Sequence, residues 1–180
     1  YDRTVRTWDA TTGKALKTFT HHSDFVHAVA WSPDGQHLFS ASKDRSVRMV
    51  EAETGASRFT FSDREDDVLA VAVHPAGKAA VSTGASPGLS WWDVSTGTKL
   101  RSLGGHRGAV NELAFDRKGT ILVSAGDDGT AKVFSGGTGA LLRSVPVGSL
   151  AYSVAVSLDG KRMAAGGFDG LARVIDPTAG

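Results

Sequence analysis

The sequence contains no cysteine, and only two methionines and two tyrosines among its 180 residues. Without thiols the chain forms no disulfide, binds no metal through thiolate and uses no cysteine nucleophile, although this absence leaves the cellular compartment open. No apolar run approaches the roughly 18 residues that span a bilayer, and no secretory signal begins the chain. The formal net charge is only +1, with both signs interspersed. This composition disfavours membrane and nucleic-acid partners.

Glycine, in contrast, is abundant, with 22 residues, and it marks a repeat of the whole sequence. The phrase that runs from Asp2 to Gly13 returns with starts at positions 44, 86, 128 and 169, so the step is 42 residues three times and then 41. A second marker keeps this period, in turns that end at Gly35, Gly77, Gly119 and Gly160. Such a period indicates an array of one supersecondary unit, whose function lies on the surface of the array.

Each period predicts four short strands, which we label a to d in chain order. In the unit that begins at residue 21, apolar alternation predicts strands at 26–31, 37–42, 47–51 and 58–61, separated by turns rich in glycine and aspartate. Four strands in about 40 residues are the blade of a β-propeller. The a-strands at 68–73, 110–115 and 151–156 are nearly continuous apolar runs. We therefore expect neighbouring blades to cover both of their faces.

The repeat places the whole chain, 1–180, in one array without a second domain. We expect strands c and d of a partial blade in 1–20, whole blades in 21–62, 63–104 and 105–145, and strands a, b and c of a last blade in 146–180. The chain holds about 4.3 periods, whereas closed propellers typically have about 4–8 blades. Closure into four blades would leave one c strand redundant. We therefore predict an incomplete ring, completed by further blades of a longer protein or by a second copy.

Several short motifs carry a family resemblance. Trp8-Asp9, Trp92-Asp93, Gly105-His106 and Asp127-Asp128-Gly129-Thr130, at these spacings, resemble the WD-repeat family. The resemblance covers the whole chain. It implies an all-β propeller of four-stranded antiparallel blades, a scaffold that binds proteins or peptides, and it brings no cofactor with it.

Two sets of side chains have the composition of a hydrolase triad, and they recur at the same spacing. In nucleophilic catalysis the histidine would activate the serine and the aspartate would orient the histidine, but neither an oxyanion hole nor a nucleophile elbow accompanies them. In the family, the same positions and a tryptophan on strand c form a structural hydrogen-bond network. The resemblance therefore assigns no catalytic residue, and it assigns to structural networks His22, Ser40, Asp44, His106, Ser124, Asp128, Trp8 and Trp92.

The networks depart from the family pattern in most blades. Val50, Phe134 and Ile175 stand at the tryptophan position, and the blade in 63–104 has Arg64 and Ser86 in place of histidine and aspartate. A buried polar group left unpaired costs about 1–3 kcal/mol, whereas replacing several partners together with apolar groups is nearly neutral. These departures leave the fold intact.

Two charged or polar clusters have simpler explanations than a site. Residues 21–27 contain three histidines and one aspartate, yet His22 belongs to a network and neighbours on a strand point to opposite faces, so we assign no metal site. The run 63–67 contains four acidic residues and one arginine. We interpret it as a solvated loop whose acidity would attract a basic partner.

The resemblance implies that partners bind the face that carries the d–a and b–c loops. The family positions on that face flank the first valine of strand a and precede the turn aspartate. The candidate partner-binding residues are Tyr1, Phe25, His27, Lys43, Asp67, Leu69, Asn111, Asp127, Leu150, Tyr152 and Phe168. The aromatic residues among them are the predicted anchors, because large rigid side chains dominate interface energies. Local packing between adjacent loops is the alternative.

Three function classes follow. The leading hypothesis is a non-catalytic scaffold for protein or peptide partners, able to self-associate through open blade edges. The alternative is a regulatory or accessory propeller of a larger enzyme, or a propeller-type enzyme. A nucleic-acid binder is disfavoured by the scattered charge. The compartment stays undecided, with a cytoplasmic location slightly favoured over a secreted or periplasmic one.

Overall fold

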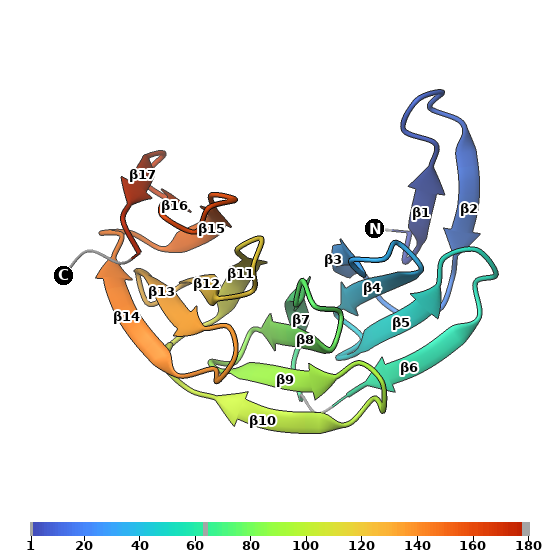
Figure 1. Cartoon of the computed structure of the whole chain (residues 1–180), viewed down its shortest axis with the longest axis horizontal. Coiled ribbons are helices and arrows are strands. Elements are labelled where there is room, and N and C mark those ends of the chain that lie inside the picture. Colours follow the sequence, from blue (N-terminus) through green and yellow to red (C-terminus); the bar gives the residue numbers. More distant parts are fainter. Residues whose placement is uncertain (1, 63–64, 178–180) are drawn as a thin grey trace.

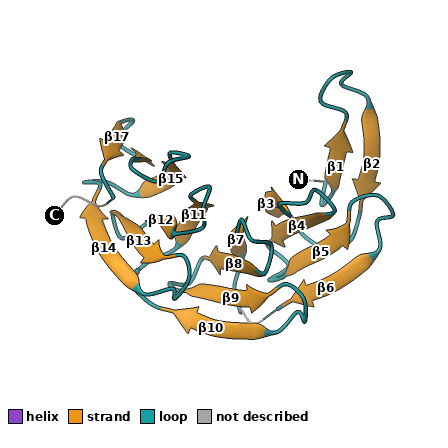
Figure 2. Cartoon of the chain, viewed as in Figure 1, coloured by secondary structure: helices purple, strands orange, loops and turns teal. Residues whose placement is uncertain are grey.

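The computed structural model describes residues 2–62 and 65–177, and every regular element in these ranges is a β-strand (Figure 2). The seventeen strands form five antiparallel sheets that follow one another in chain order. Figure 1 shows the sheets side by side along an arc, with residues 5–19 at one end and residues 151–175 at the other. The predicted all-β propeller is confirmed. Within the described residues, no helix is long and apolar enough to cross a membrane.

The sheets contain two, four, four, four and three strands. The first sheet pairs β1 (Val5–Trp8) with β2 (Ala15–Phe19). The next is β3 (Val26–Trp31), β4 (His37–Ser42), β5 (Val47–Glu51) and β6 (Ser57–Phe61). The third is β7 (Val68–Val73), β8 (Ala79–Gly84), β9 (Leu89–Asp93) and β10 (Lys99–Leu103).

The fourth sheet is β11 (Val110–Phe115), β12 (Ile121–Gly126), β13 (Thr130–Ser135) and β14 (Leu141–Pro146). The last is β15 (Ala151–Val156), β16 (Met163–Gly167) and β17 (Ala172–Ile175). β14 ends at Pro146, one residue beyond the unit 105–145 expected from the repeat. Tyr1, Asp63 and Arg64 lie outside the described residues.

The hydrophobic core lies between successive sheets rather than inside any one of them. Phe39, Met49 and Phe61 of the second sheet pack with Val71 and Trp92 of the third. Similar clusters join the third sheet to the fourth and the fourth to the last. Each sheet therefore draws its stability from its immediate neighbours, as in other repeat proteins.

The a-strands are covered by neighbours only in the middle of the arc. β7 and β11 are buried or half-buried along their length, as the sequence predicts. β15 departs from this expectation, since Ser153 and Ala155 are exposed. The reason is its position, because β15 belongs to the last sheet of the arc among the residues that the structure describes. β3 is likewise open on one side, with Val29 57% exposed, because the sheet before it contains only two strands.

Antiparallel pairing sends alternate connections to opposite ends of the strands. The d–a loops and b–c turns meet at one end, which we call the b–c face. The a–b and c–d turns meet at the other, which we call the a–b face. Strands of five or six residues are about 17–20 Å long, so the two faces are well separated.

Candidate partner-binding face

The same irregularity occurs near the start of every complete a-strand. The register shifts by one residue at Val26/Ala28, Val68/Ala70, Val110/Glu112 and Ala151/Ser153. The residue skipped in each case is His27, Leu69, Asn111 or Tyr152, all four of which are sequence candidates. A β-bulge leaves one residue unpaired and re-aims its side chain, which is why bulges occur often beside functional sites.

The bulges bring these four candidates together in space. His27, Leu69, Asn111 and Tyr152 line one pocket of about 430 Å³, formed by β3, β7, β11 and β15. The a-strand residues Val29, Val71, Glu112 and Ser153 also line it. The pocket thus lies where the inner strands of four sheets meet, with a mixed apolar and polar lining suited to a partner's side chain.

Glu112 is a pocket residue that the sequence analysis missed. Its carboxylate accepts hydrogen bonds from the Ser153 hydroxyl at 2.6 Å and from the Val154 amide at 2.7 Å. Asn111 beside it donates through Nδ2 to Asp127 at 2.7 Å and to the Ala151 carbonyl at 2.9 Å. Together they tie β11 to β15. The available signal was a carboxylate inside the apolar run 110–115.

Two of the remaining candidates contact each other rather than the pocket. The Lys43 ammonium lies 5.4 Å from the centre of the Phe25 ring, and the Lys43 amide donates to the Phe25 carbonyl at 2.8 Å. One side of the predicted Phe25 anchor is therefore occupied by a cation–π contact. Asp67 does not line the pocket, but its carboxylate lies 4.0 Å from Nε2 of His27, which does.

The last sheet presents an exposed aromatic pair next to the pocket. The rings of Tyr152 and Phe168 are 6.1 Å apart in an edge-to-face arrangement, and these residues are 48% and 72% exposed. Leu150, 39% exposed, joins them, and its carbonyl accepts a hydrogen bond from the Phe168 amide at 2.9 Å. Local packing between loops therefore orders these residues and still leaves most of the surface of Phe168 accessible.

The two histidine sets form the hydrogen bonds of a triad, but inside the sheets. His22 donates through Nδ1 to Asp44 at 2.8 Å and accepts at Nε2 from the Ser40 hydroxyl at 2.7 Å. His106 repeats this arrangement with Asp128 at 3.0 Å and Ser124 at 2.6 Å. Ser40 is only 5% exposed and Ser124 is 0% exposed. Solvent and substrate therefore do not reach either hydroxyl in this structure.

Burial and hydrogen bonding set the charge states of these networks. Burial lowers the pKa of His22 and His106, more than the neighbouring aspartates raise it, so both rings are neutral near pH 7. Burial raises the pKa of Asp128, but hydrogen bonds from Thr130, His106 and the Arg107 amide outweigh it and lower the pKa to about 2. Each network thus pairs a neutral imidazole with a carboxylate.

The two tryptophan candidates differ in their surroundings. The Trp92 indole is buried and donates through Nε1 to the Ser82 hydroxyl at 2.8 Å. Trp8 is 55% exposed, and no hydrogen bond joins its indole to another described residue. Its sheet consists of β1 and β2, and among the described residues no a or b strand beside them presents a histidine or serine to it.

The histidine cluster at residues 21–27 is divided among different contacts. His21 donates through Nε2 to the Gly55 carbonyl at 3.0 Å, while His22 points into its network. Within the described residues, no group of three or more histidine, cysteine, aspartate or glutamate side chains is placed to hold a metal ion.

Comparison with known proteins places these features in a family. The model of the family described as "WD domain, G-beta repeat" matches residues 13–50, 97–135 and 144–176, together more than half of the chain. The unmatched stretch 51–96 includes Ser86, which replaces the turn aspartate found at position 44 and position 128.

Individual relatives share short segments with the chain. It is 46% identical over 39 residues to nuclear distribution protein PAC1 from Mycosarcoma maydis, covering 22% of the chain and 9% of that protein. It is 49% identical over 43 residues to the protein of the same name from Coccidioides posadasii, covering 24% and 9%. It is 46% identical over 44 residues to coronin-7 from Mus musculus, covering 24% and 5%. The chain therefore matches less than a tenth of these relatives' length.

Proposed function

The chain belongs to the WD40 repeat family, and from this premise we propose that it is a non-catalytic scaffold that binds a protein or peptide on its b–c face. The observation that carries the proposal is the pocket lined by His27, Leu69, Asn111 and Tyr152, together with the exposed pair Tyr152 and Phe168 beside it. A pocket beside rigid exposed aromatics is the arrangement that protein interfaces use for their strongest contacts.

The chemistry of the face supports a mixed partner segment. Leu69, Tyr152 and Phe168 offer apolar contact, whereas His27 with Asp67, and Asn111 with Asp127, offer polar groups around it. Such a combination suits a segment that inserts one apolar side chain and hydrogen-bonds around it. The burial of Ser40 and Ser124 supports a structural role for the two histidine networks, in preference to catalysis.

The test is the affinity of a partner for defined variants. The natural full-length protein, immobilised, captures its partner, and the purified partner is then titrated by isothermal calorimetry. We expect Tyr152→Ala to weaken binding by more than about 1 kcal/mol, roughly fivefold, because truncation removes an aromatic contact at the pocket. Leu158→Ala is the matched control: Leu158 is exposed in the same sheet but lies on the a–b face.

Two results would contradict the proposal. One is an unchanged affinity for Tyr152→Ala. The other is a larger loss for Leu158→Ala than for Tyr152→Ala, which would place the partner on the opposite face. Melting temperatures of both variants within a few degrees of the parent protein exclude unfolding as the cause of any loss.

A further inference from the structure

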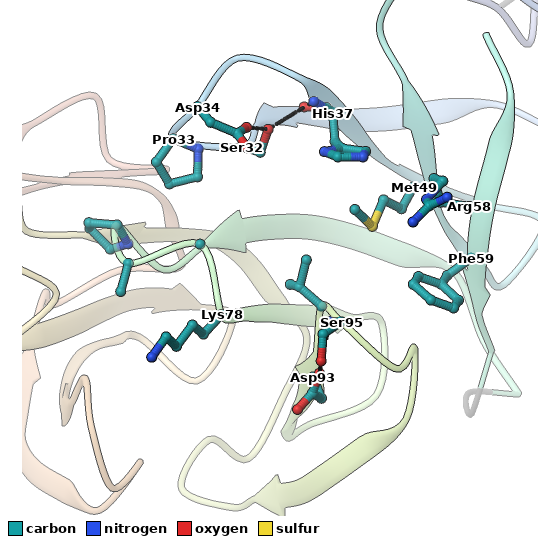
Figure 3. A pocket seen from close by; sticks show the side chains of 14 residues that line it. Ser32, Pro33, Asp34, His37, Met49, Arg58, Phe59, Lys78, Asp93 and Ser95 are labelled. Carbon is teal, nitrogen blue, oxygen red and sulfur yellow. Dashed lines mark hydrogen bonds between the residues drawn. The ribbon is translucent and has the colours of Figure 1, made fainter. Parts of the chain in front are cut away.

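A second hollow lies on the a–b face, opposite the pocket described above. It has a volume of about 640 Å³ and lies between the second and third sheets (Figure 3). Pro33 and Pro75, from the two a–b turns, line it together with Met49 and Phe59 of the second sheet. Val94, from the c–d turn of the third sheet, adds a further apolar group. We call this hollow the interblade groove.

The repeat explains why this interface is open. One period later, the positions of Ser32 and Met49 are occupied by His74 and Trp91. The His74 ring donates through Nε2 to the Gly119 carbonyl at 3.1 Å, across to the next sheet. The rings of His74 and Trp91 both contact Phe115 of that sheet, with centres 5.1 and 5.9 Å apart from it.

The rings of His74 and Trp91 therefore fill the interface between the third and fourth sheets. At the equivalent positions between the second and third sheets, Ser32 has only a hydroxymethyl group and Met49 a flexible thioether. The short Ser32 side chain instead donates to Asp34 of its own turn. The groove is consequently a property of particular residues in this chain and not a necessary feature of the fold.

The charged side chains around the groove differ in whether another group of the chain already binds them. The Asp34 and Asp93 carboxylates accept hydrogen bonds within their own turns, from Ser32 and Ser95 respectively, and these bonds lower the pKa of both groups. In the described part of the chain, no ion pair or hydrogen bond occupies the guanidinium of Arg58 or the ammonium of Lys78. Figure 3 shows Arg58 beside Met49, and Lys78 on the other side of the groove.

We propose that the interblade groove binds a short segment of another protein, which inserts one apolar side chain between Phe59 and the prolines and places an adjacent carboxylate on Arg58. The volume lies within the range of about 300–1,000 Å³ that ligand pockets occupy. A guanidinium donates two parallel hydrogen bonds to a carboxylate, so Arg58 would fix the orientation of the bound carboxylate as well as attract its charge. This site is separate from the b–c face and does not depend on the function proposed for it.

The test uses a random twelve-residue peptide library displayed on phage and selected on the whole chain. Fluorescein-labelled copies of the selected peptides are then titrated by fluorescence anisotropy. We expect peptides with an apolar residue next to aspartate or glutamate, and we expect Arg58→Glu to weaken their binding by roughly tenfold, since like charges then face each other. Lys118→Glu is the control, because it makes the same charge change on an exposed a–b turn outside the groove.

A second variant tests the groove by filling it. Met49→Trp introduces the ring that Trp91 supplies at the next interface, and we expect it to abolish binding of the same peptides. Because overpacking destabilises some cores, the surface variant Arg58→Glu keeps the test valid if Met49→Trp fails to fold.

Selected peptides that bind Arg58→Glu and the parent chain equally would overturn the proposal, as would a selection that yields no peptide sensitive to Arg58→Glu. Sensitivity to Tyr152→Ala instead would assign the peptides to the b–c face and would also overturn the groove proposal.

Discussion

In each of two sheets, one buried histidine forms hydrogen bonds to a serine and an aspartate of the same sheet. These residues are His22 in the second sheet and His106 in the fourth. His106 is neutral because burial disfavours its charged form, and in that form one nitrogen donates to Asp128 while the other accepts from Ser124. Protonation would remove the acceptor and leave the buried Ser124 hydroxyl without its partner. An unpaired buried group of this kind costs about 1–3 kcal/mol. The structure of the sheet is thus linked to the protonation of one ring.

This linkage predicts a loss of stability in mild acid. Unfolded histidine has a pKa of about 6.5, and the folded pKa of His22 and His106 is lower. Below pH of about 6.5 the unfolded state therefore binds more protons, and the free energy of unfolding falls as pH drops through the folded pKa. A second loss follows in strong acid, as pH falls from the unfolded value of 3.8 toward the folded value of about 2 for Asp128.

Thermal melts followed by circular dichroism from pH 8 down to about pH 2 measure both losses. His106→Gln lowers the melting temperature throughout but reduces the slope below pH 6.5 by about half, because one of the two buried titrating rings is gone. The control, Leu158→Ala, removes an exposed side chain that does not titrate and keeps the slope of the parent. A slope unaffected by His106→Gln would show that other groups carry the acid sensitivity.

The c–d turns show how an element is fitted to the sheet before it. Gly97 has a φ of +73°, and a Cβ built there would lie 2.5 Å from Cδ1 of Phe59 and 2.8 Å from its Cγ. Gly13 occupies the equivalent turn of the first sheet with a φ of +70°, but nothing lies within 4 Å of its Cβ position. The two turns share a backbone requirement and differ in packing.

Alanine substitutions separate these two effects. Gly13→Ala is expected to cost about 1–2 kcal/mol, the penalty of a left-handed conformation for a residue with a Cβ. Gly97→Ala adds the displacement of the Phe59 ring, an overpacking cost of about 1–3 kcal/mol. Urea denaturation measures both free energies of unfolding. Equal losses in the two variants would mean that Phe59 moves aside freely.

Among the described residues, two of the five sheets have fewer than four strands. β1 pairs only with β2, and β17 pairs only with β16, at opposite ends of the arc (Figure 1). Val174 on β17 is 72% exposed, and Trp8 on β1 is 55% exposed. Open strand edges with apolar side chains are templates for pairing with another chain.

We therefore expect the 180-residue chain, taken alone, to self-associate. Size-exclusion chromatography with light scattering should show species heavier than the 18.7 kDa monomer. Val174→Lys should shift the population toward the monomer, since a lysine on an edge strand discourages pairing. Leu158→Lys, an equally apolar-to-charged change in a turn of the same sheet, should not. A single monomeric species for the parent chain would contradict this expectation.

Much of the fold was predictable because its signals are local. Turn glycines and period-two alternation identify strands such as Val68–Val73 and Val110–Phe115 wherever they occur along the chain. The contacts of His106 with Ser124 and Asp128 likewise follow from the repeat, because sheets with the same strand register bring the same repeat positions together. Of the candidate face, the family positions named His27, Leu69, Asn111 and Tyr152, which the pocket brings together.

Other features were not predictable, because they depend on contacts between units. Nothing in the alternation of β11 indicates that the Glu112 carboxylate accepts hydrogen bonds from β15. Nor does the sequence indicate that the Lys43 ammonium lies over the Phe25 ring. The exposure of Ser153 and Ala155 also departs from the prediction that β15 is a covered strand.

The sequence alone determined the repeat, the strands, the turns and the family, since each depends on residues within one period. Only the tertiary structure decided which repeat positions meet, for example that four bulges converge on one pocket. It also decided that Ser32 and Met49 leave a groove between the second and third sheets, whereas His74 and Trp91 fill the equivalent space between the third and fourth. The physical reason is that the core of this protein lies between sheets. Space at an interface depends on the side chains of both sheets, which the pattern within either one does not specify.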